Sequence, residues 1–431
     1  MIKYFVIFFL IVKFNTLHAE NNVLFFVESA LQKNPKINAE RENLKAVKQN
    51  ENISKSEFFP SLTISGSQTS AETSNIIDQS GVRSGDTKRN TETKKISVDQ
   101  KIFQGFQGYN NFKKSRLEFE KAKKEYKQVE QDTILNSVST YYDLIFKKKS
   151  KDFNLANVDL FERQVESDRS RLQKGEISLT DLAQSESSLA GAQAAFIKAD
   201  SEYVSAIAEF ERINRISAPK DINDNFGLSF TMPQSLKEVL ELSNSQNPSL
   251  AIARINLAIS ERELNVEKAR LSPSATLNYS KTENKDLSAT IDEDDKETVK
   301  ATVTWPIIQG GKNFSSIKKF KHKKEKNALL LEDKENEIKT QSATSWSFFQ
   351  SAEGVLASTE AQLKAAEIAN EGITLEYDSG NTRTTLDVIQ SRSLLLEARI
   401  SNAEAKKDLI ISKMRVLSQV GGLNLKAFKI P

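Results

Sequence analysis

The chain has 431 residues, and its 61 basic and 58 acidic side chains nearly balance, giving a formal net charge of +3. This balance argues against a general nucleic-acid binder, which needs a strongly basic surface. The sequence has no cysteine and two histidines, which excludes disulfides, thiolate metal sites, cysteine nucleophiles and lipidation on cysteine, and almost excludes histidine-based chemistry. We therefore predict no catalytic residue, no metal site and no cofactor.

Residues 1–19 have the pattern of a secretory signal peptide. Lys3 supplies a short basic start, an apolar run follows over residues 4–12, and Ala19 ends a plausible cleavage site. The run is too short to span a bilayer as a helix, and the polar residues 20–22 after it disfavour a buried helix of the mature fold. The sequence predicts an exported protein in which strands make any membrane crossing.

The mature part of the sequence contains an internal duplication. The interval from Asn34-Pro35 to Pro60-Ser61 equals the interval from Asn247-Pro248 to Pro273-Ser274. A tandem duplication of this length indicates one structural unit used twice in a pseudo-symmetric object. Such an object encloses a space between its copies more naturally than it forms one catalytic pocket.

The duplication divides the mature chain into a first repeat (20–213), a linker (214–234) and a second repeat (235–431). Each repeat has the same predicted order of elements, which is a helix, a β-hairpin, a long helix and a coiled-coil helix. The linker is rich in Asp, Asn, Pro and Gly, which is typical of a connecting segment.

The two β-hairpins are predicted over residues 61–103 and 274–308. Leu62, Ile64 and Gly66 alternate with Ser and Thr in the first strand, which is the period of a strand with two different faces. Four such strands match the pattern of a transmembrane β-barrel. Four strands cannot close a barrel within a bilayer, so either several subunits contribute strands jointly or the strands lie outside a membrane.

A long helix is predicted after each hairpin, over about 106–173 and about 311–378. At 1.5 Å per residue, each would be about 100 Å long if continuous. A glycine-containing turn follows each long helix, and further helices are predicted over about 179–213 and 383–419. Their heptad stripes are typical of a coiled-coil core.

The order and spacing of these motifs resemble the TolC family of outer-membrane channel proteins, which serve multidrug efflux and type I secretion. The resemblance covers essentially the whole mature sequence. Besides the doubled Asn-Pro and Pro-Ser motifs, it rests on Gln104-Gly105 and Gln309-Gly310, and on the turns 175–181 and 377–387. It implies a mainly α fold with a small β part, in which a homotrimer forms a coiled-coil tunnel and each protomer gives four strands to a shared twelve-stranded transmembrane barrel.

The resemblance also implies a function without catalytic residues. It implies an exit duct that spans the outer membrane and periplasm and is gated by an iris of coiled-coil pairs at the periplasmic end. The implied partners are a periplasmic adaptor (membrane fusion) protein, an inner-membrane transporter of RND or ABC type, and outer-membrane lipid. No nucleic acid is expected.

The implied gate residues lie on the two turns. Thr180 and Asp181 match the positions of partners for an aromatic residue and an arginine, which are Tyr377 and Arg383 in this chain. A link from Arg383 to Asp181 or Thr180 would be charge-assisted, although an exposed pair contributes little. Thr180 and Asp181 are also residue types that cap helices, and capping and gating are compatible.

Asp387 matches the first of two pore-lining aspartates of the family. Three copies of this residue around an axis would favour cations. Gln390 stands at the second position, which puts a doubled acidic ring in doubt.

Lysine-rich segments open both long helices, at residues 113–124 and 318–324. One hypothesis is a basic collar near phospholipid head groups, and the alternative is a solvated helix face. For the whole protein, the competing interpretation is an exported coiled-coil tether of the cell envelope without a conduit. A tether has no need of four alternating strands at matching places, and an exported enzyme lacks the residues for catalysis.

Overall fold

The computed structural model describes residues 23–74, 77, 79–83, 85–219, 231–288, 291–379 and 383–425. The predicted signal peptide and most of the predicted linker lie outside these residues. The chain divides into two compact units, which we call the helical unit (Met1–Glu40, Tyr126–Pro248 and Asn336–Pro431) and the sheet unit (Arg41–Glu125 and Ser249–Glu335). Each unit takes segments from both sequence repeats.

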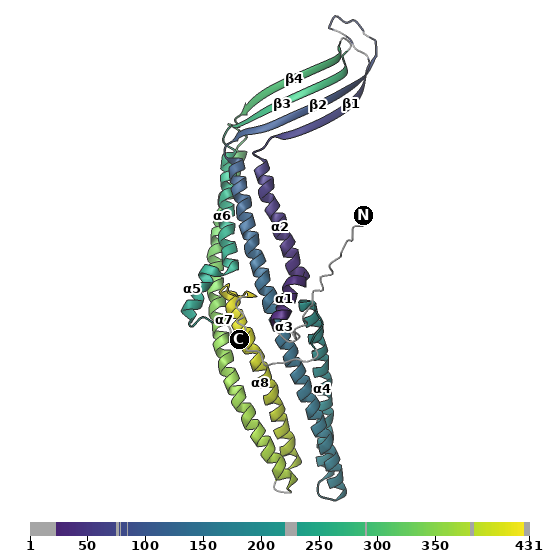
Figure 1. Cartoon of the computed structure of the whole chain (residues 1–431), viewed down its shortest axis with the longest axis vertical. Helices are drawn as coiled ribbons and strands as arrows, with labels where there is room; N and C mark the ends of the chain where they lie inside the picture. Colours follow the sequence, from purple (N-terminus) through teal and green to yellow (C-terminus); the bar gives the residue numbers. More distant parts are fainter. Residues whose placement is uncertain are drawn as a thin grey trace, which may run out of the picture. The chain divides into compact units, whose positions relative to one another are not determined.

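The sheet unit contains one antiparallel sheet in the order β1-β2-β3-β4 (Figure 1). The strands are β1 (Ser61–Thr73), β2 (Thr87–Gln104), β3 (Ser274–Ser288) and β4 (Ile291–Thr304). The two hairpins are joined through β2 and β3, so β1 and β4 are the sheet edges. β4 ends before the predicted limit at residue 308 because Pro306 has no N–H for the strand ladder.

The two faces of the sheet differ in chemistry. The strand register places Leu62, Val98, Tyr279 and Val299 in one row across all four strands. The next row, which points to the other face, consists of Thr63, Ser97, Ser280 and Thr298. In these rows the predicted alternation is continuous across all four strands, so an apolar face and a hydroxyl-rich face lie at this end of the sheet. Farther along the strands, the apolar face also carries Lys281 and Glu297.

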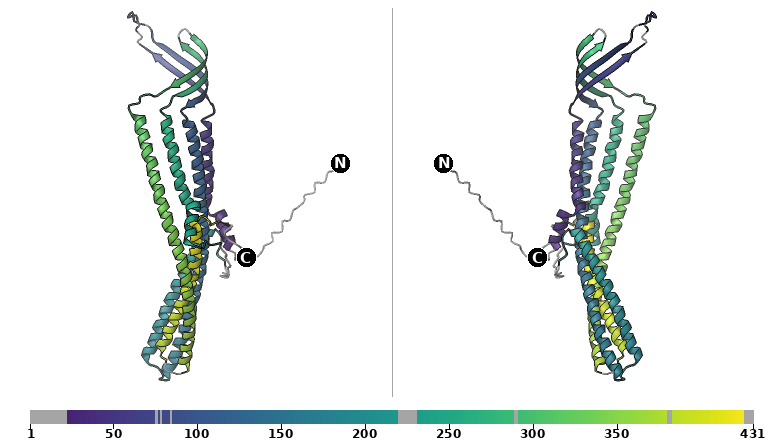
Figure 2. Two further views of the ribbon diagram at one scale, coloured as in Figure 1. Left: turned by 90° about the vertical axis from the view of Figure 1, so that its left-hand side faces the viewer. Right: turned by 90° about the vertical axis from the view of Figure 1, so that its right-hand side faces the viewer.

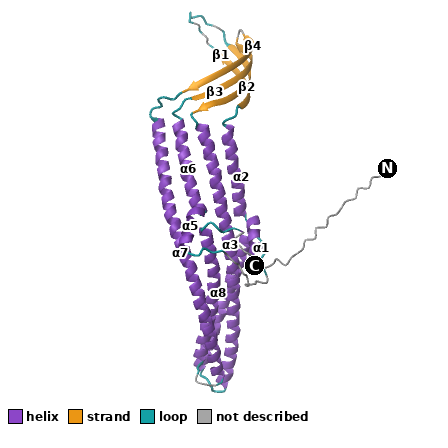
Figure 3. Ribbon diagram, turned by 60° about the vertical axis from the view of Figure 1, so that its left-hand side comes forward, coloured by secondary structure: helices purple, strands orange, loops and turns teal. Residues whose placement is uncertain are grey.

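Four helical segments accompany the sheet in this unit (Figure 3). They come from α2 (Pro35–Ser56), the first part of α3 (Gln107–Gln173), α6 (Pro248–Ala269) and the first part of α7 (Lys312–Asp378). Gly105 connects β2 to α3 with a φ of 57°, and a Cβ there would lie 2.5 Å from the carbonyl oxygen of Ala269. Only glycine fits this position, which accounts for the Gln-Gly motif after the first hairpin.

The helical unit contains two antiparallel helix pairs (Figure 2). They are formed by α3 with α4 (Leu179–Asn214) and by α7 with α8 (Thr385–Gln419), and the short helices α1 (Val23–Lys33) and α5 (Leu236–Gln246) accompany them. The long helices are continuous, with 67 residues each in α3 and α7. The predicted bounds of the four helices α3, α4, α7 and α8 agree with the observed bounds to within about two residues. None of the described helices is both long and apolar enough to cross a membrane.

The doubled Asn-Pro motif has the same structural role in both repeats. The Asn34 amide donates to the carbonyl oxygen of Ile213 at 2.9 Å, and the Asn247 amide donates to that of Gln419 at 2.9 Å. Each asparagine thus satisfies a free carbonyl at the end of the last helix of its own repeat. The core beside the first of these contacts is aromatic, with Phe26 5.1 Å from both Tyr141 and Phe210 between ring centroids.

Candidate gate at the two helix turns

The turns α3–α4 and α7–α8 both lead into a helix that starts with a capping box. Ser178 begins α4, where its hydroxyl accepts from the Asp181 N–H at 3.2 Å and its own N–H donates to Asp181 at 2.9 Å. Thr384 and Asp387 form the same pair of bonds at 3.3 and 2.8 Å at the start of α8. Asp181 and Asp387 therefore occupy equivalent positions, each as the third residue of its helix.

These hydrogen bonds stabilise the ionised carboxylates. The side chain and backbone of Ser178 lower the pKa of Asp181 below its ordinary value. The backbone and side chain of Thr384 lower the pKa of Asp387 in the same way. Both groups are negative at neutral pH, at the positive end of a helix dipole. Thr180 lies one position before Asp181 and is exposed, so Ser178 rather than Thr180 is the cap.

Tyr377, near the end of α7, is buried, with 6% of its surface exposed. Its hydroxyl donates to an Asp168 carboxylate oxygen at 3.0 Å and lies 3.1 Å from the Thr385 hydroxyl. Burial raises the pKa of Tyr377, so the phenol stays protonated and keeps its role as a donor. The guanidinium of Arg171 lies over the ring, 4.6 Å from its centroid, at the distance of a cation–π contact.

Asp168 is fully buried at 0% exposure and joins the two repeats. Besides Tyr377, it accepts hydrogen bonds from Ser185 at 2.5 Å and from Gln164 at 3.0 Å. With Thr385, these residues form what we call the Asp168 network, and they come from α3, α4, α7 and α8. A buried carboxylate is tolerated because its lone pairs are satisfied, and removing a partner from such a group is costly.

Arg383 pairs with Glu376 rather than with the predicted partners. Its Nε donates to the Glu376 carboxylate at 2.6 Å. Glu376 lies on the last turn of α7, whereas Asp181 uses its carboxylate in the capping box of the other repeat. The expected link from Arg383 to Asp181 or Thr180 is therefore not formed within this chain, and the structure brings together Tyr377 and Asp168 instead.

Asp168 and Glu376 were not predicted from the sequence. A signal for Asp168 was present, because it continues the helical spacing of the buried residues Val158, Phe161 and Val165. An acidic residue on a buried stripe requires partners from neighbouring elements. Ser185 of α4 supplies one of these partners.

The predicted basic collar is partly neutralised in the sheet unit. Five of its lysines lie 2.7 to 3.9 Å from a glutamate: Lys114, Lys121, Lys123, Lys323 and Lys324. Lys318, Lys319 and Lys321 are exposed. The collar is therefore less basic than the sequence suggests, and its contact with lipid remains a hypothesis.

Comparison with known proteins decides the family. Residues 26–213 and 239–422 match the model of the family described as outer membrane efflux protein. The chain belongs to the outer membrane efflux protein family. The two matched stretches lie one in each sequence repeat, and the resemblance to TolC-family channels is confirmed.

Relatives within this efflux protein family are distant in sequence and similar in fold. The chain is 23% identical over 393 residues to the outer membrane efflux protein BepC of Brucella suis, covering 91% of this chain and 83% of BepC. It is 20% identical to the alkaline protease secretion protein AprF of Pseudomonas aeruginosa, covering 76% and 69%. The CmeC outer membrane channel of Campylobacter jejuni has the same fold, with a TM-score of 0.83, 15% identity, and 94% and 86% of the two chains covered.

This efflux protein family is made up of channel proteins. The chain is accordingly an outer-membrane efflux or secretion channel protein. The tether interpretation receives no support from any of these comparisons. The mainly helical fold with four antiparallel strands, predicted from the sequence, is confirmed.

Proposed function

We propose that three copies of this chain form one exit duct, in which each copy contributes its four strands to a common barrel. The observation that carries this proposal is the two-faced sheet with edges at β1 and β4. Its apolar face is exposed within the chain, with Leu62 at 66% and Val299 at 71%. When copies join edge to edge, the backbone groups of β1 and β4 find hydrogen-bond partners, and the apolar face can lie against lipid.

Aromatic side chains next to the sheet suit contact with outer-membrane lipid. Phe59, Phe106 and Trp305 adjoin the strand ends and are 68%, 69% and 61% exposed. Aromatic girdles mark the lipid–water boundaries of outer-membrane barrels. In this arrangement the hydroxyl-rich face lines the lumen.

The two helix turns are proposed as the gate at the periplasmic end of the duct. The Asp168 network ties the end of α7 and the start of α8 to α3 and α4, and so resists separation of the two helix pairs. Arg383 and Asp181, which are not linked within one chain, remain available in this proposal as partners between copies. Asp387 would face the axis as a ring of three carboxylates, which favours cations.

The energy for export comes from partners in this proposal. The expected partners are a periplasmic adaptor and an inner-membrane transporter of RND or ABC type. Both transporter types are kept because the relatives include an efflux protein and a protease secretion protein. The shared scaffold does not select between small molecules and proteins as cargo.

The test is planar-bilayer recording of detergent-purified protein, with native mass measured in the same preparation. The expected result is the mass of three chains together with small, long-lived, cation-preferring channels. A single-chain mass without conductance would contradict the proposal and would restore the tether interpretation.

A further inference from the structure

Two grooves in the helical unit are lined by corresponding parts of the two repeats. The larger groove, of about 620 Å³, lies among α7, α8 and α3, and we call it the intrachain groove. The smaller groove, of about 330 Å³, lies between α3 and α4, and we call it the α3–α4 groove. Their relation indicates how a second copy of this chain fits.

The α3–α4 groove is the repeat-equivalent of the intrachain groove. We aligned α3 with α7 from their first residues, and α4 with α8 on the capping aspartates Asp181 and Asp387. Every residue that lines the α3–α4 groove then has a counterpart that lines the intrachain groove. The pairs used below are Asp143 with Phe348, Ser201 with Lys407, and Ser205 with Ile411.

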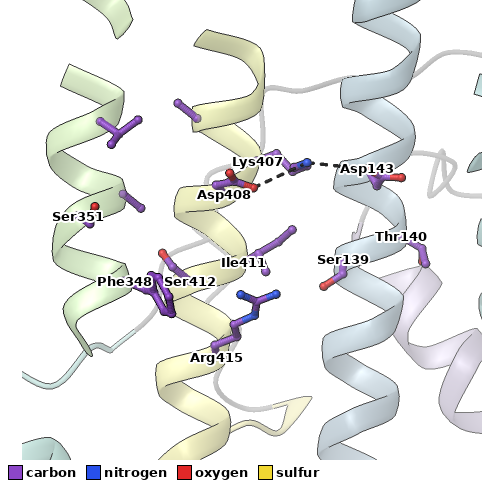
Figure 4. Close-up of a pocket in the computed structure, with 13 residues that line it drawn as sticks. Ser139, Thr140, Asp143, Phe348, Ser351, Lys407, Asp408, Ile411, Ser412 and Arg415 are labelled. Atoms are coloured by element: carbon purple, nitrogen blue, oxygen red, sulfur yellow. Dashed lines mark ion pairs between the residues drawn. The ribbon is translucent and has the colours of Figure 1, made fainter. Parts of the chain in front are cut away.

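The intrachain groove has an additional wall from the other repeat. Ser139, Thr140 and Asp143 of α3 face α8 across it. Figure 4 shows Lys407 reaching from α8 toward Asp143, with 3.9 Å between the ammonium nitrogen and the carboxylate. The residues lining the α3–α4 groove come from α3 and α4 alone, so no described part of the chain supplies the corresponding wall.

The repeat alignment identifies the helix that would supply this wall. The counterparts of Ser139, Thr140 and Asp143 are Thr344, Ser345 and Phe348 of α7. Asp143 lines both grooves, whereas Phe348 lines the intrachain groove and not the α3–α4 groove. In a ring of repeats, the same relation would place Phe348 of one copy in the α3–α4 groove of the next copy.

Side-chain sizes are complementary at this second junction. Within the chain, the short Asp143 meets the long Lys407 and the branched Ile411. In the α3–α4 groove, Ser201 and Ser205 stand at the equivalent positions, which leaves room for an aromatic ring. Phe348 is 60% exposed in the single chain, and burying its ring between copies would remove this apolar surface from water.

We propose that the α3–α4 groove seats α7 of a neighbouring copy, with that copy's Phe348 placed against Ser201 and Ser205. The inference rests on the proposed trimer and assigns its subunit junction. It makes the two kinds of junction in the ring chemically distinct. One is an ion pair within a chain, and the other is an aromatic ring against two serines between chains.

The test uses thiol cross-linking, because the chain has no cysteine of its own. The variant Ser201→Cys with Phe348→Cys is purified as the full chain in detergent, treated with a short bis-maleimide and run on a denaturing gel. Bands of two and three chain masses are expected, because the reagent bridges cysteines on facing helices whose Cα atoms lie too far apart for a disulfide. A second variant, Ser205→Cys with Phe348→Cys, repeats the test at the adjacent serine.

The matched control is Asp143→Cys with Lys407→Cys, the equivalent pair inside one chain. The same reagent should link these two cysteines within one chain, without dimer or trimer bands, seen as a linked peptide after proteolysis. If the native mass is three chains and the control cross-links but neither serine pair does, the proposed junction is wrong and the trimer stands. A single-chain native mass would overturn both.

Discussion

The turn between α3 and α4 and the turn between α7 and α8 start their second helix in the same way. Ser178 with Asp181 and Thr384 with Asp387 form equivalent capping boxes. Each turn also carries one exposed ion pair, Arg171–Glu176 at 3.2 Å and Arg383–Glu376 at 2.6 Å. Locally, the two turns are therefore stabilised by the same interactions.

The two turns differ in what holds them to the rest of the helical unit. Tyr377 of the second turn binds the buried Asp168, whereas the corresponding position of the first turn is Leu172. The comparison separates two contributions. Capping fixes each turn by itself, and the Asp168 network fixes one helix pair against the other. Of the two, only the Asp168 network is suited to control whether the helix pairs separate.

The largest effect is expected when Asp168 is replaced by alanine. This change leaves the donors of Tyr377, Ser185 and Gln164 without their acceptor, at a cost of about 1–3 kcal/mol. The network belongs to the closed arrangement of the helix pairs in this proposal. Its loss should therefore raise the ratio of open to closed channels about fivefold or more. Single-channel recording measures this ratio.

Two further variants separate the effect of the buried network from the effect of charge alone. Asp168→Asn keeps one acceptor oxygen for Tyr377 and should give a smaller change. Asp159→Ala removes an exposed carboxylate from the same helix and should leave gating unchanged. Equal effects of Asp159→Ala and Asp168→Ala would show that charge alone, rather than the buried network, is responsible.

An intermediate effect is expected from loss of the caps. Ser178→Ala should destabilise α4 by about 1 kcal/mol, and Thr384→Ala should do the same to α8. Thermal unfolding of the detergent-solubilised protein should show similar shifts for the two variants. A much larger shift at Thr384 would mean that this cap, and not only the Asp168 network, contributes to the contact between the helix pairs.

The smallest effect is expected from acidification. The pKa values of Asp181 and Asp387 are lowered in the folded state. Their stabilising contribution is therefore present above the unfolded-state pKa of about 3.9 and is lost as the pH falls through the lowered values. Thermal stability should decline below about pH 4 from this cause. The decline should be shallower in the Ser178→Ala, Thr384→Ala double variant, and an unchanged slope would contradict the assignment.

The sequence predicted the parts of the fold that depend on local or periodic patterns. Helices, hairpins and the repeat follow from spacing, and the capping role of Asp181 follows from its residue type and place. Glu376, the partner of Arg383 within the chain, was missed because it lies on the adjoining helix turn and no family position indicated it. The link from Arg383 to Asp181 or Thr180 stays a prediction. The Asp168 network was missed because its members come from four helices, and no local pattern reports their meeting.

The most direct test of the gate compares single-channel conductance of the unmodified protein with that of the Tyr377→Phe, Arg383→Ser double variant. The first change removes the hydroxyl that binds Asp168, and the second removes the guanidinium proposed to link copies. We expect a small conductance for the unmodified channel and a raised conductance for the variant. Equal conductances, in preparations of equal native mass, would contradict the assignment of the gate to these two turns.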